Sequence, residues 1–236
     1  MSGPSVQLLA HTAEPERTVA LAARLCYSAR GVADLAAGLS EAEVESLLEK
    51  LLAMGHLSAL EHAQFTLGVE GISRACSHQL VRHRVASYSQ QSQRYVALRR
   101  VQAVVPPSIE DRPELAAAFR RALEQAWALY GRLVDEGVPA EDARYLLPNA
   151  CETKLVVSMN ARELRHFFSL RLCRRAQWEV RALARAMLGA VEAVAPRLFR
   201  GAGPGCLAGS CPEGAYSCGQ AAEVRRELAE GVRRDP

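Results

Sequence analysis

Lysine is nearly missing from this sequence. Only two of the 29 basic residues are lysines, Lys50 and Lys154, so arginine is the usual cation and its abundance alone does not mark a binding surface. The formal net charge is only +3. Bulk electrostatics therefore do not require nucleic acid or a membrane as a partner.

Long apolar runs and a secretory leader are also missing. No uninterrupted apolar run approaches the roughly 18–20 residues that span a bilayer. Residues 1–16 lack a basic stretch followed by an apolar core, the pattern of a secretory signal. Seven cysteines form an odd number without the spacing of a small disulfide scaffold. We therefore expect a cytoplasmic protein with reduced, buried thiols in apolar or helical settings at Cys26, Cys76, Cys151 and Cys173.

What the sequence does contain is ample apolar material, 49% of its residues, arranged in two periodicities. Helical spacing predicts helices at 14–28, 40–55, 72–83, 113–137, 160–171 and 176–199, the last of them interrupted near Pro196. Shorter helices are expected from Pro139 to before Pro148 and at 221–231. Alternating or β-branched residues predict strands at 64–70, 101–105 and 151–158. We expect an α+β fold with helices packed on a small central sheet, in a single domain at 1–200 followed by a Gly- and Cys-containing tail at 201–236.

Two helices carry recognisable start signals. Ser40 and Glu43 have the spacing of a capping box, and Gly55 suits the left-handed end of the same helix. Asn160 and Glu163 repeat this spacing before the helix that ends at Arg171. On that helix we expect Leu164, Phe167, Phe168 and Leu170 to face inward. The outward residues are then Arg162, Arg165, His166 and Arg171.

Residues 71–109 contain no Asp or Glu, although an ordinary solvated face mixes both charge signs. The stretch holds six arginines and two histidines: Arg74, Arg82, Arg84, Arg94, Arg99, Arg100, His78 and His83. A guanidinium group grips phosphate through a planar two-pronged contact, and interspersed Ser and Gln side chains can read a sugar or base edge. The stretch therefore predicts a binding site for an anionic ligand.

The expected helix at 72–83 places Gln79 and His83 on one face, as it does His78 and Arg82. Its polar side would then converge on whatever Arg82 holds. Residues 88–94 are too polar for a core element, and we expect them to form a loop that faces the ligand.

Two groups of residues are of the types that ligate metal ions. His56 and His62 are six residues apart, so one helix would not aim both at one ion, and we expect no metal there. In the tail, three thiols lie at spacings of five and seven, whereas a zinc site normally has four ligands in close pairs. A metal site, a redox or disulfide role and an inert tail stay open for Cys206, Cys211 and Cys218.

Arg82-His83-Arg84, followed by Ser87, Ser92 and Arg94, resembles the signature of flavin-dependent thymidylate synthases. These residues fill every fixed position of that signature, while Gln90 stands where the family often has Glu, which removes one negative charge. A second block resembles the same family: Asn160-Ala161-Arg162, then His166 and Arg171, then Ala176 to Glu179. Arg175 stands where the family usually has His. The resemblance covers roughly residues 20–194.

This resemblance implies reductive methylation of deoxyuridylate (dUMP) to thymidylate (dTMP). 5,10-Methylenetetrahydrofolate would supply the carbon, and FAD reduced by NADPH would supply the hydride. The family forms homotetramers with active sites assembled from several subunits. The implied FAD contacts are His56, Ser58, Glu61, Arg82, His83, Arg84, Gln90, Asn160, Arg162 and His166. The implied nucleotide contacts are Gln79, Arg82, Gln90, Gln91, Ser92, Gln93, Arg94, Arg144 and Arg171.

Arg171 is the residue that we expect to be catalytic. A fixed guanidinium lowers the energy of a neighbouring anion, here the N3-deprotonated uracil. No cysteine lies within the polar motifs, so we expect a mechanism without an enzyme thiolate, in which the flavin performs the difficult chemistry. The sequence places no base beside Ser92, which we therefore assign to hydrogen bonding of substrate rather than to nucleophilic attack.

Two other classes of function stay open. A nucleic-acid-binding module would use the acid-free stretch for backbone contacts. That stretch offers only Tyr88 and Tyr95 as stacking aromatics, however, which disfavours this class. A structural scaffold with a cationic face would bind neither dUMP nor FAD.

Overall fold

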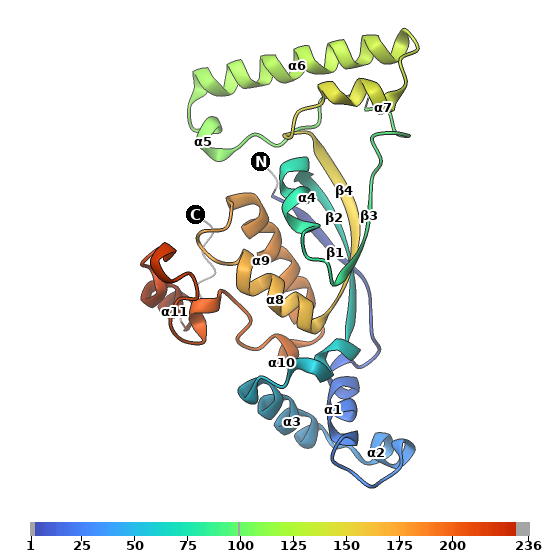
Figure 1. Cartoon of the computed structure of the whole chain (residues 1–236), viewed down its shortest axis with the longest axis vertical. Coiled ribbons are helices and arrows are strands. Elements are labelled where there is room, and N and C mark those ends of the chain that lie inside the picture. The colour runs from blue at the N-terminus through green and yellow to red at the C-terminus, as the bar shows by residue number, and fades with distance from the viewer. Residues whose placement is uncertain (1–2, 99, 230–236) are drawn as a thin grey trace. The chain divides into compact units, whose positions relative to one another are not determined.

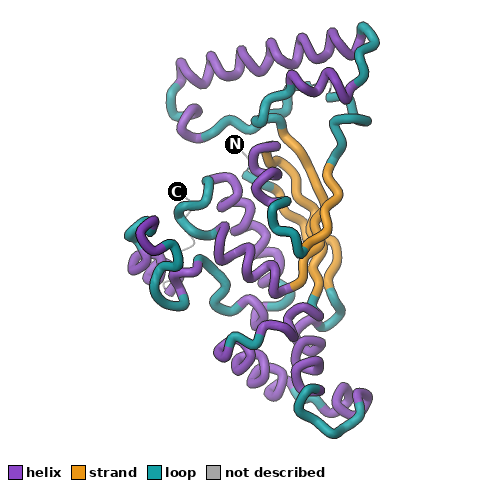
Figure 2. Tube along the Cα trace, in the orientation of Figure 1, coloured by secondary structure: helices purple, strands orange, loops and turns teal. Residues whose placement is uncertain are grey.

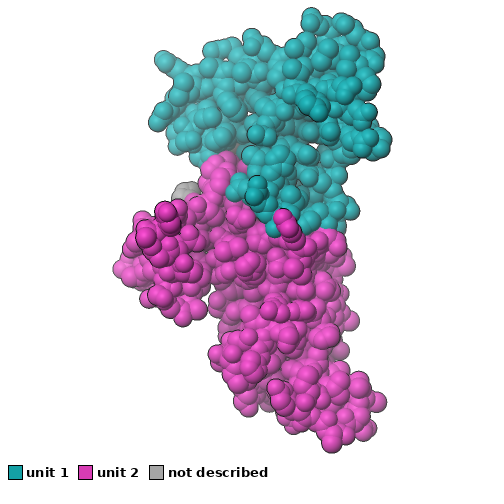
Figure 3. All heavy atoms as spheres, in the orientation of Figure 1, with its two compact units in different colours: residues 1–5, 69–82, 88–156 teal, residues 6–68, 83–87, 157–236 magenta. Residues whose placement is uncertain are grey.

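The computed structural model describes residues 3–98 and 100–229. The chain falls into two compact units (Figure 3): unit 1 comprises residues 1–5, 69–82 and 88–156, and unit 2 comprises residues 6–68, 83–87 and 157–236. Helices and a small sheet account for the regular structure (Figure 2), which confirms the expected α+β fold. The expected boundary at residue 200 remains a prediction.

One four-stranded sheet has the order β1-β2-β4-β3 (Figure 1). Its strands are β1 (Ser5–His11), β2 (Gln64–Ser73), β3 (Ala86–Gln90) and β4 (Glu152–Asn160). β2 and β4 are antiparallel, because the Ala161 N–H donates to the Ala63 carbonyl while the Arg74 N–H donates to that of Cys151. The strands expected at 64–70 and 151–158 are thereby confirmed, each slightly longer than predicted.

Two edge strands were not predicted. β1 has no buried residue, and its apolar alternation is limited to Val6 and Leu8 before Leu9 and Ala10 interrupt it, so its sequence carries little signal. β3 occupies Tyr88–Gln90, for which a ligand-facing loop was expected, and that part of the prediction is wrong. An edge strand has a neighbour on one side only, so it tolerates polar side chains that a central strand would not.

The strand expected at 101–105 does not form. This segment makes one antiparallel bridge, between Ala103 and Cys151, supported by the Val104 N–H donating to the Ala150 carbonyl. The bridge meets the chain just where β4 begins. From there on, β4 has β2 and β3 as its two neighbours, so no free edge remains with which the β-branched residues could extend a ladder.

Helix α4 (Arg74–Leu80) begins two residues later than expected. Ile72 and Ser73 still belong to β2, and the Ser73 hydroxyl caps the helix by accepting a hydrogen bond from the Cys76 N–H at 3.0 Å. The helix also ends early, at Leu80. Arg82 and His83 thus lie beyond it, and the helix faces predicted for them are wrong.

The remaining helices of unit 1 lie in the order α5 (Pro107–Glu110), α6 (Pro113–Asp135), α7 (Ala140–Ala143) and the 3-10 turn η2 (Arg144–Leu146). Trp127 and Leu123 of α6 pack with Cys151 in a small core. Tyr130 is buried, and its hydroxyl accepts from the Leu98 N–H at 3.3 Å. Trp127 and Tyr130 are thus core residues of unit 1, whereas Leu115 near the start of α6 is exposed.

Unit 2 contains α1 (Pro15–Leu25), α2 (Val32–Gly38), α3 (Glu41–Met54), η1 (Leu57–His62), α8 (Ala161–Arg171), α9 (Trp178–Glu192), α10 (Pro196–Phe199), η3 (Gly205–Leu207), η4 (Gly214–Tyr216) and α11 (Ala221–Ala229). Four buried phenylalanines form its aromatic core, with ring centroids 5.4–6.0 Å apart from one to the next: Phe65, Phe199, Phe168 and Phe167. Such edge-on pairs add stability beyond the area that they bury.

Both ends of α3 match the sequence signals. Ser40 and Glu43 make both halves of the capping box, and Gly55 adopts φ 71° at the end. Two residues that were expected to be buried, Cys26 and Leu170, are exposed, and Cys173 is only half-buried.

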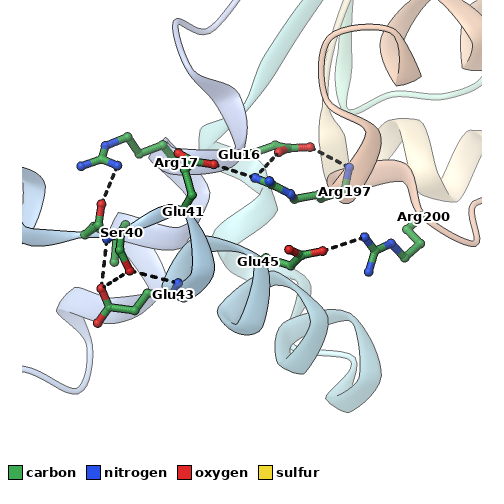
Figure 4. A network of polar contacts seen from close by, with 9 residues as sticks. Glu16, Arg17, Ser40, Glu41, Glu43, Glu45, Arg197 and Arg200 are labelled. Carbon is green, nitrogen blue, oxygen red and sulfur yellow. Dashed lines mark hydrogen bonds and ion pairs between the residues drawn. The ribbon is translucent and has the colours of Figure 1, made fainter.

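An ion-pair network links α1, α3 and α10 (Figure 4). Glu16 accepts from the Arg197 backbone N–H at 2.6 Å and from its guanidinium at 3.1 Å, and Glu41 holds the same guanidinium at 3.0 Å. Arg200 pairs with Glu45 and Glu49 of α3. The short helix α10, which follows the break predicted near Pro196, is thus fixed by carboxylates from two other helices.

The tail packs on the rest of unit 2 through two adjacent arginines. Arg174 donates to Gln220, Glu223 and Glu227, which anchors α11. Arg175 donates to the Tyr216 carbonyl, and its guanidinium lies 5.6 Å from the centre of the Tyr216 ring. The arginine that departs from the family pattern therefore serves here as a tail contact.

No helix within residues 3–98 and 100–229 is both long and apolar enough to cross a bilayer.

Candidate functional site

Two cavities contain predicted site residues. The larger of these two lies within unit 2 and has a volume of about 630 Å³. The start of α8 supplies its polar wall, η1 contributes a second side, and residues 201–208 contribute a Gly-rich third side. Four residues that were predicted to contact FAD line this cavity: Glu61, Asn160, Arg162 and His166. A volume of this size is typical of cavities that hold small molecules.

The turn from β4 into α8 positions this polar wall. Asn160 is the last residue of β4, and its side-chain oxygen accepts from the Glu163 N–H at 2.8 Å, as the cap spacing predicted. Arg162 follows on the exposed side and pairs with Glu61 of η1. The ion pair joins two segments whose residues were each expected to contact the cofactor.

His83 lies buried at the centre of a polar chain in unit 2. Its Nδ1 is 3.2 Å from the Glu163 carboxylate, and its Nε2 accepts from the Arg171 Nε–H at 3.1 Å. The ring contacts Phe167 edge-on, with centroids 4.9 Å apart, and His166 at 5.9 Å. Two segments far apart in sequence, the stretch around His83 and helix α8, are thereby held together.

Burial sets the charge states along this chain. It lowers the pKa of His83 to about 4, with smaller contributions from the nearby Arg171 and His166, so the imidazole is neutral at pH 7. Burial also raises the pKa of Glu163, an effect that His166 opposes. A neutral imidazole thus separates a carboxyl group from a guanidinium.

Sequence reasoning found most of these residues but missed Glu163 as part of the site. His83, Asn160, His166 and Arg171 were predicted from the two conserved blocks. Glu163 was expected only as a capping partner, and that spacing fully accounted for its presence. No signal in the sequence indicated that its carboxylate contacts His83.

A second cavity, of about 220 Å³, lies within unit 1. Two of its residues, Gln93 and Arg144, were predicted to bind the nucleotide. Four other residues also line it. Arg74 and His78 were named as cations of the acid-free stretch but not as nucleotide contacts, and Tyr145 and Asn149 were not singled out. Arg74 and His78 are four apart on α4 and share a face, which is the signal that could have found them. Two guanidinium groups and an imidazole suit this cavity to a phosphate.

The side chain of Arg144 is fixed by a single hydrogen bond. Its Nε donates to the Glu141 carbonyl at 3.1 Å, and within the described residues its terminal nitrogens have no partner. The Glu141 carboxylate instead accepts from Arg94 at 2.9 Å on an exposed surface, and Arg94 does not line the cavity. Ser92 accepts from the Arg94 backbone N–H at 3.1 Å. Of the predicted nucleotide-binding arginines in unit 1, Arg144 is therefore the one positioned in the cavity.

The predicted glutamines of unit 1 are fixed by protein partners. Gln90 donates to the hydroxyls of Ser77 at 3.0 Å and Thr153 at 3.1 Å. The Gln79 amide donates to the Ala75 carbonyl at 3.3 Å, and the Gln91 backbone N–H donates to the Lys154 carbonyl at 3.0 Å. The side-chain amides of Gln79 and Gln90 are thus oriented before any ligand binds, whereas Gln91 is fixed through its backbone.

Four further predicted residues are exposed and line neither cavity: His56, Ser58, Arg82 and Arg84. Within the described part of the chain, the guanidinium groups of Arg82 and Arg84 make no hydrogen bond or ion pair. They are cations without an internal partner.

The thiols are free and poorly suited to nucleophilic attack in unit 1. Cys76 and Cys151 are buried, and burial raises the pKa of Cys151, which keeps it protonated. In unit 2, burial raises the pKa of Cys206, and Cys211, Cys173 and Cys218 add to the effect. Among the residues that the structure describes, no group of three or more His, Cys, Asp or Glu is arranged to hold a metal ion.

Known proteins resemble this chain over most of its length. Residues 7–197 match the family described as "Thymidylate synthase complementing protein". A protein of Geobacter sulfurreducens named "Flavin-dependent thymidylate synthase" is 58% identical over 227 residues, which cover 95% of this chain and 98% of the relative. A protein of the same name from Clostridium tetani is 48% identical over 240 residues, covering 95% and 96%.

A solved structure supports the same relationship. The crystal structure of a UMP/dUMP methylase, PolB from Streptomyces cacaoi bound with 5-Br dUMP, has a TM-score of 0.71 and 27% sequence identity to this chain. The match covers 85% of this chain and 96% of the methylase.

Proposed function

Because the chain belongs to the flavin-dependent thymidylate synthase family, we propose that it methylates dUMP reductively to dTMP. 5,10-Methylenetetrahydrofolate is the carbon donor, and FAD reduced by NADPH is the hydride source. The observation that carries this proposal is the convergence of both conserved blocks on one polar chain, in which His83 contacts Arg171. The solved methylase with 5-Br dUMP supports the choice of substrate.

FAD fits the donors around the larger cavity. Asn160 offers an amide, His166 an imidazole and Arg162 a guanidinium, which suit the ring edge and the diphosphate of a dinucleotide. When bound, FAD supplies the hydride chemistry that no side chain can perform. The remaining proposed cofactor contacts are His56, Ser58, Glu61, Arg82, His83, Arg84 and Gln90.

The smaller cavity suits the dUMP phosphate. Arg144 presents its terminal nitrogens there, and Arg74 and His78 of α4 add donors that the dianion requires. Gln93 also lines the cavity and can donate through its amide. The further proposed nucleotide contacts are Gln79, Arg82, Gln90, Gln91, Ser92, Arg94 and Arg171.

Arg171 acts on the uracil ring. Its Nε is fixed on His83, so the plane of the guanidinium is set before substrate arrives. A preoriented cation stabilises negative charge as it develops on the deprotonated ring, without reorganisation at the moment of reaction. The buried thiols Cys76 and Cys151 cannot supply a thiolate readily, which supports activation by polarisation rather than by covalent addition.

We also propose a cytoplasmic homotetramer whose active sites draw residues from several subunits. The partners are then small molecules, dUMP and folate, with no nucleic acid and no membrane. Ligand-binding residues spread over distant segments are compatible with shared sites.

Anaerobic turnover of dUMP labelled with tritium at C5 tests the proposal. With NADPH, FAD and methylenetetrahydrofolate present, we expect release of tritium to water together with dTMP. Absorbance at about 450 nm in the purified protein would indicate the bound flavin. A nucleic-acid-binding module or a scaffold would give neither signal. A preparation that holds FAD and dUMP but forms no dTMP under these conditions overturns the proposal.

A further inference from the structure

Two helices of unit 2 begin with the same cap spacing, but their glutamates behave differently. In α3, the Glu43 carboxylate returns to the Ser40 N–H at 3.0 Å and closes the capping box. In α8, Asn160 makes its half of the contact, but the Glu163 carboxylate reaches His83 instead. The side chain that would cap its own helix is therefore committed to the site.

Donor and acceptor chemistry fixes the tautomer of His83. A guanidinium group carries only donors, so the His83 Nε2 that faces the Arg171 Nε–H must be the unprotonated nitrogen. A neutral imidazole has one donor and one acceptor, which places its hydrogen on Nδ1. The Glu163 oxygen 3.2 Å away then accepts that hydrogen.

The other protonation states conflict with this geometry. If Glu163 were protonated and donated to Nδ1, the hydrogen of His83 would move to Nε2 and face the Arg171 Nε–H. A doubly protonated His83 would create the same conflict. Both states therefore release Arg171 from the ring.

The surroundings make this arrangement costly to replace. The side chain of His83 is 4% exposed and that of Glu163 is 10% exposed, so water cannot readily substitute for either partner. Phe167 packs edge-on against the ring and limits its rotation. The neighbouring charged and titratable groups are His166 and Arg171, with Glu61, Arg162 and Arg165 along the same cavity wall.

We propose that Glu163 is a positioning residue: it holds His83 in the Nδ1–H tautomer, and His83 in turn orients the guanidinium of Arg171 toward the substrate. In this role Glu163 acts on Arg171 through His83, while its side chain also lines the larger cavity. The inference rests on the proposed function, because it gives Arg171 its task on the uracil ring.

Steady-state kinetics of the FAD-loaded enzyme test the role with two substitutions. Glu163→Leu removes the acceptor, and we expect kcat to fall by about 10- to 100-fold while the KM for dUMP changes little, the range found for partners that orient a working side chain. Glu163→Gln keeps an oxygen acceptor, so it should retain most of the activity. Glu16→Gln is the matched control, a largely buried carboxylate paired with Arg197 outside both cavities, and its kcat should equal wild type.

The pH dependence of kcat gives a readout that a merely structural role would not move. Burial raises the pKa of Glu163, so kcat at saturating dUMP should fall as the pH drops through that raised value and the carboxyl becomes a donor. Glu163→Gln has no group to titrate there. Its acid limb should move to lower pH, while that of Glu16→Gln stays with wild type.

A direct measurement of the tautomer needs no turnover. In protein labelled with ¹⁵N-histidine, the His83 signals are those absent from His83→Gln. Wild type and Glu163→Gln should show a protonated Nδ1 and an unprotonated Nε2 at pH 7, and Glu163→Leu should lose this single state.

Each outcome decides the matter. Four results would each overturn the inference. Two are kinetic: Glu163→Leu keeps the wild-type kcat, or both variants lose activity equally. The other two are an unshifted acid limb in Glu163→Gln and a wild-type His83 that is protonated on Nε2. If Glu163→Leu fails to fold, the pH profile of Glu163→Gln still decides it. Failure of the wild-type enzyme to form dTMP would instead overturn the proposed function.

Discussion

Arg171 is the side chain on which the proposed chemistry most depends. It combines a fixed Nε with a half-buried position at the end of α8. We expect Arg171→Ala to lower kcat by about 100- to 1000-fold, the cost of losing one preorganised donor to a developing anion. Flavin absorbance should be unchanged in the same preparation.

The control for this variant is Arg132→Ala, which removes an exposed arginine of α6 and should leave turnover at the wild-type level. Loss of flavin together with activity in Arg171→Ala would assign Arg171 to holding the cofactor rather than to acting on uracil.

The hydrogen bonds of Gln90 give a physical reason for the departure from the family pattern at this position. Ser77 donates its hydroxyl hydrogen to the Arg74 carbonyl at 3.0 Å, so its oxygen can only accept, and the Gln90 amide supplies the donor. A glutamate there would place two acceptors together. We expect Gln90→Glu to lower the free energy of unfolding by about 1–3 kcal/mol. Urea denaturation measures this, with the exposed Gln102→Glu as a control that should shift little.

The cysteines should differ widely in reactivity toward a thiol reagent at pH 7. Cys26 and Cys218 are exposed and should be labelled first. Burial raises the pKa of Cys151 and of Cys206, so each holds less thiolate and should react slowly until the pH is raised. Mass spectrometry of labelled peptides gives the order. Labelling of Cys151 as fast as that of Cys26 would contradict the closed environment described for it.

Sequence reasoning placed individual residues well where a motif or a cap fixed them. Asn160 caps α8 as predicted, and Arg144, predicted to contact the nucleotide, lines a cavity together with Arg74 and His78. It failed for Glu163 because local capping already explained that residue, and a long-range contact leaves no periodic trace. It misplaced His83 because the end of α4 at Leu80 carries no Gly or Pro to mark it.

At the scale of elements, the attachment of α10 depends on Glu16. This carboxylate, 15% exposed, accepts from both the backbone and the side chain of Arg197. We expect Glu16→Ala to cost about 1.5–3 kcal/mol of unfolding free energy, as for hydrogen bonds to charged groups. Denaturation at one fixed protein concentration measures it, since association would otherwise shift the midpoint.

Glu49→Ala provides the comparison on the same network. Its carboxylate pairs with Arg200 but is 56% exposed, so its loss should cost about 0–1 kcal/mol. Equal effects of the two substitutions would show that burial does not govern the strength of this network.

Helices were predicted more accurately than strands, for a physical reason. Helix α3 begins and ends within a residue of its cap signals, because Ser40 and Gly55 act locally. Strands depend on a partner elsewhere in the chain. The sequence therefore could not reveal that residues 101–105 find only one bridge, or that the polar β3 pairs along an edge.

At the scale of the whole molecule, mixing of subunits tests the proposed shared active sites. Arg144→Ala and Arg171→Ala should each be inactive alone. If a site takes these residues from different subunits, tetramers reassembled from an equal mixture should recover about a quarter of wild-type turnover, because each native residue is present half of the time. Sedimentation should give a mass about four times 25.7 kDa.

Sites made within one subunit would contain a substitution in every case, so such a mixture would stay inactive. A monomer in sedimentation would contradict the proposed assembly directly.

The wall of the larger cavity formed by residues 201–208 lies beyond the stretch that the family description matches, which ends at residue 197. A compound anchored only on Asn160 and His166 would meet residues from the family's second conserved block. One that extends to Ala208 would also meet the tail, which lies outside the matched stretch. Comparing the two kinds of compound on this enzyme and on a relative would show how much selectivity the tail can provide.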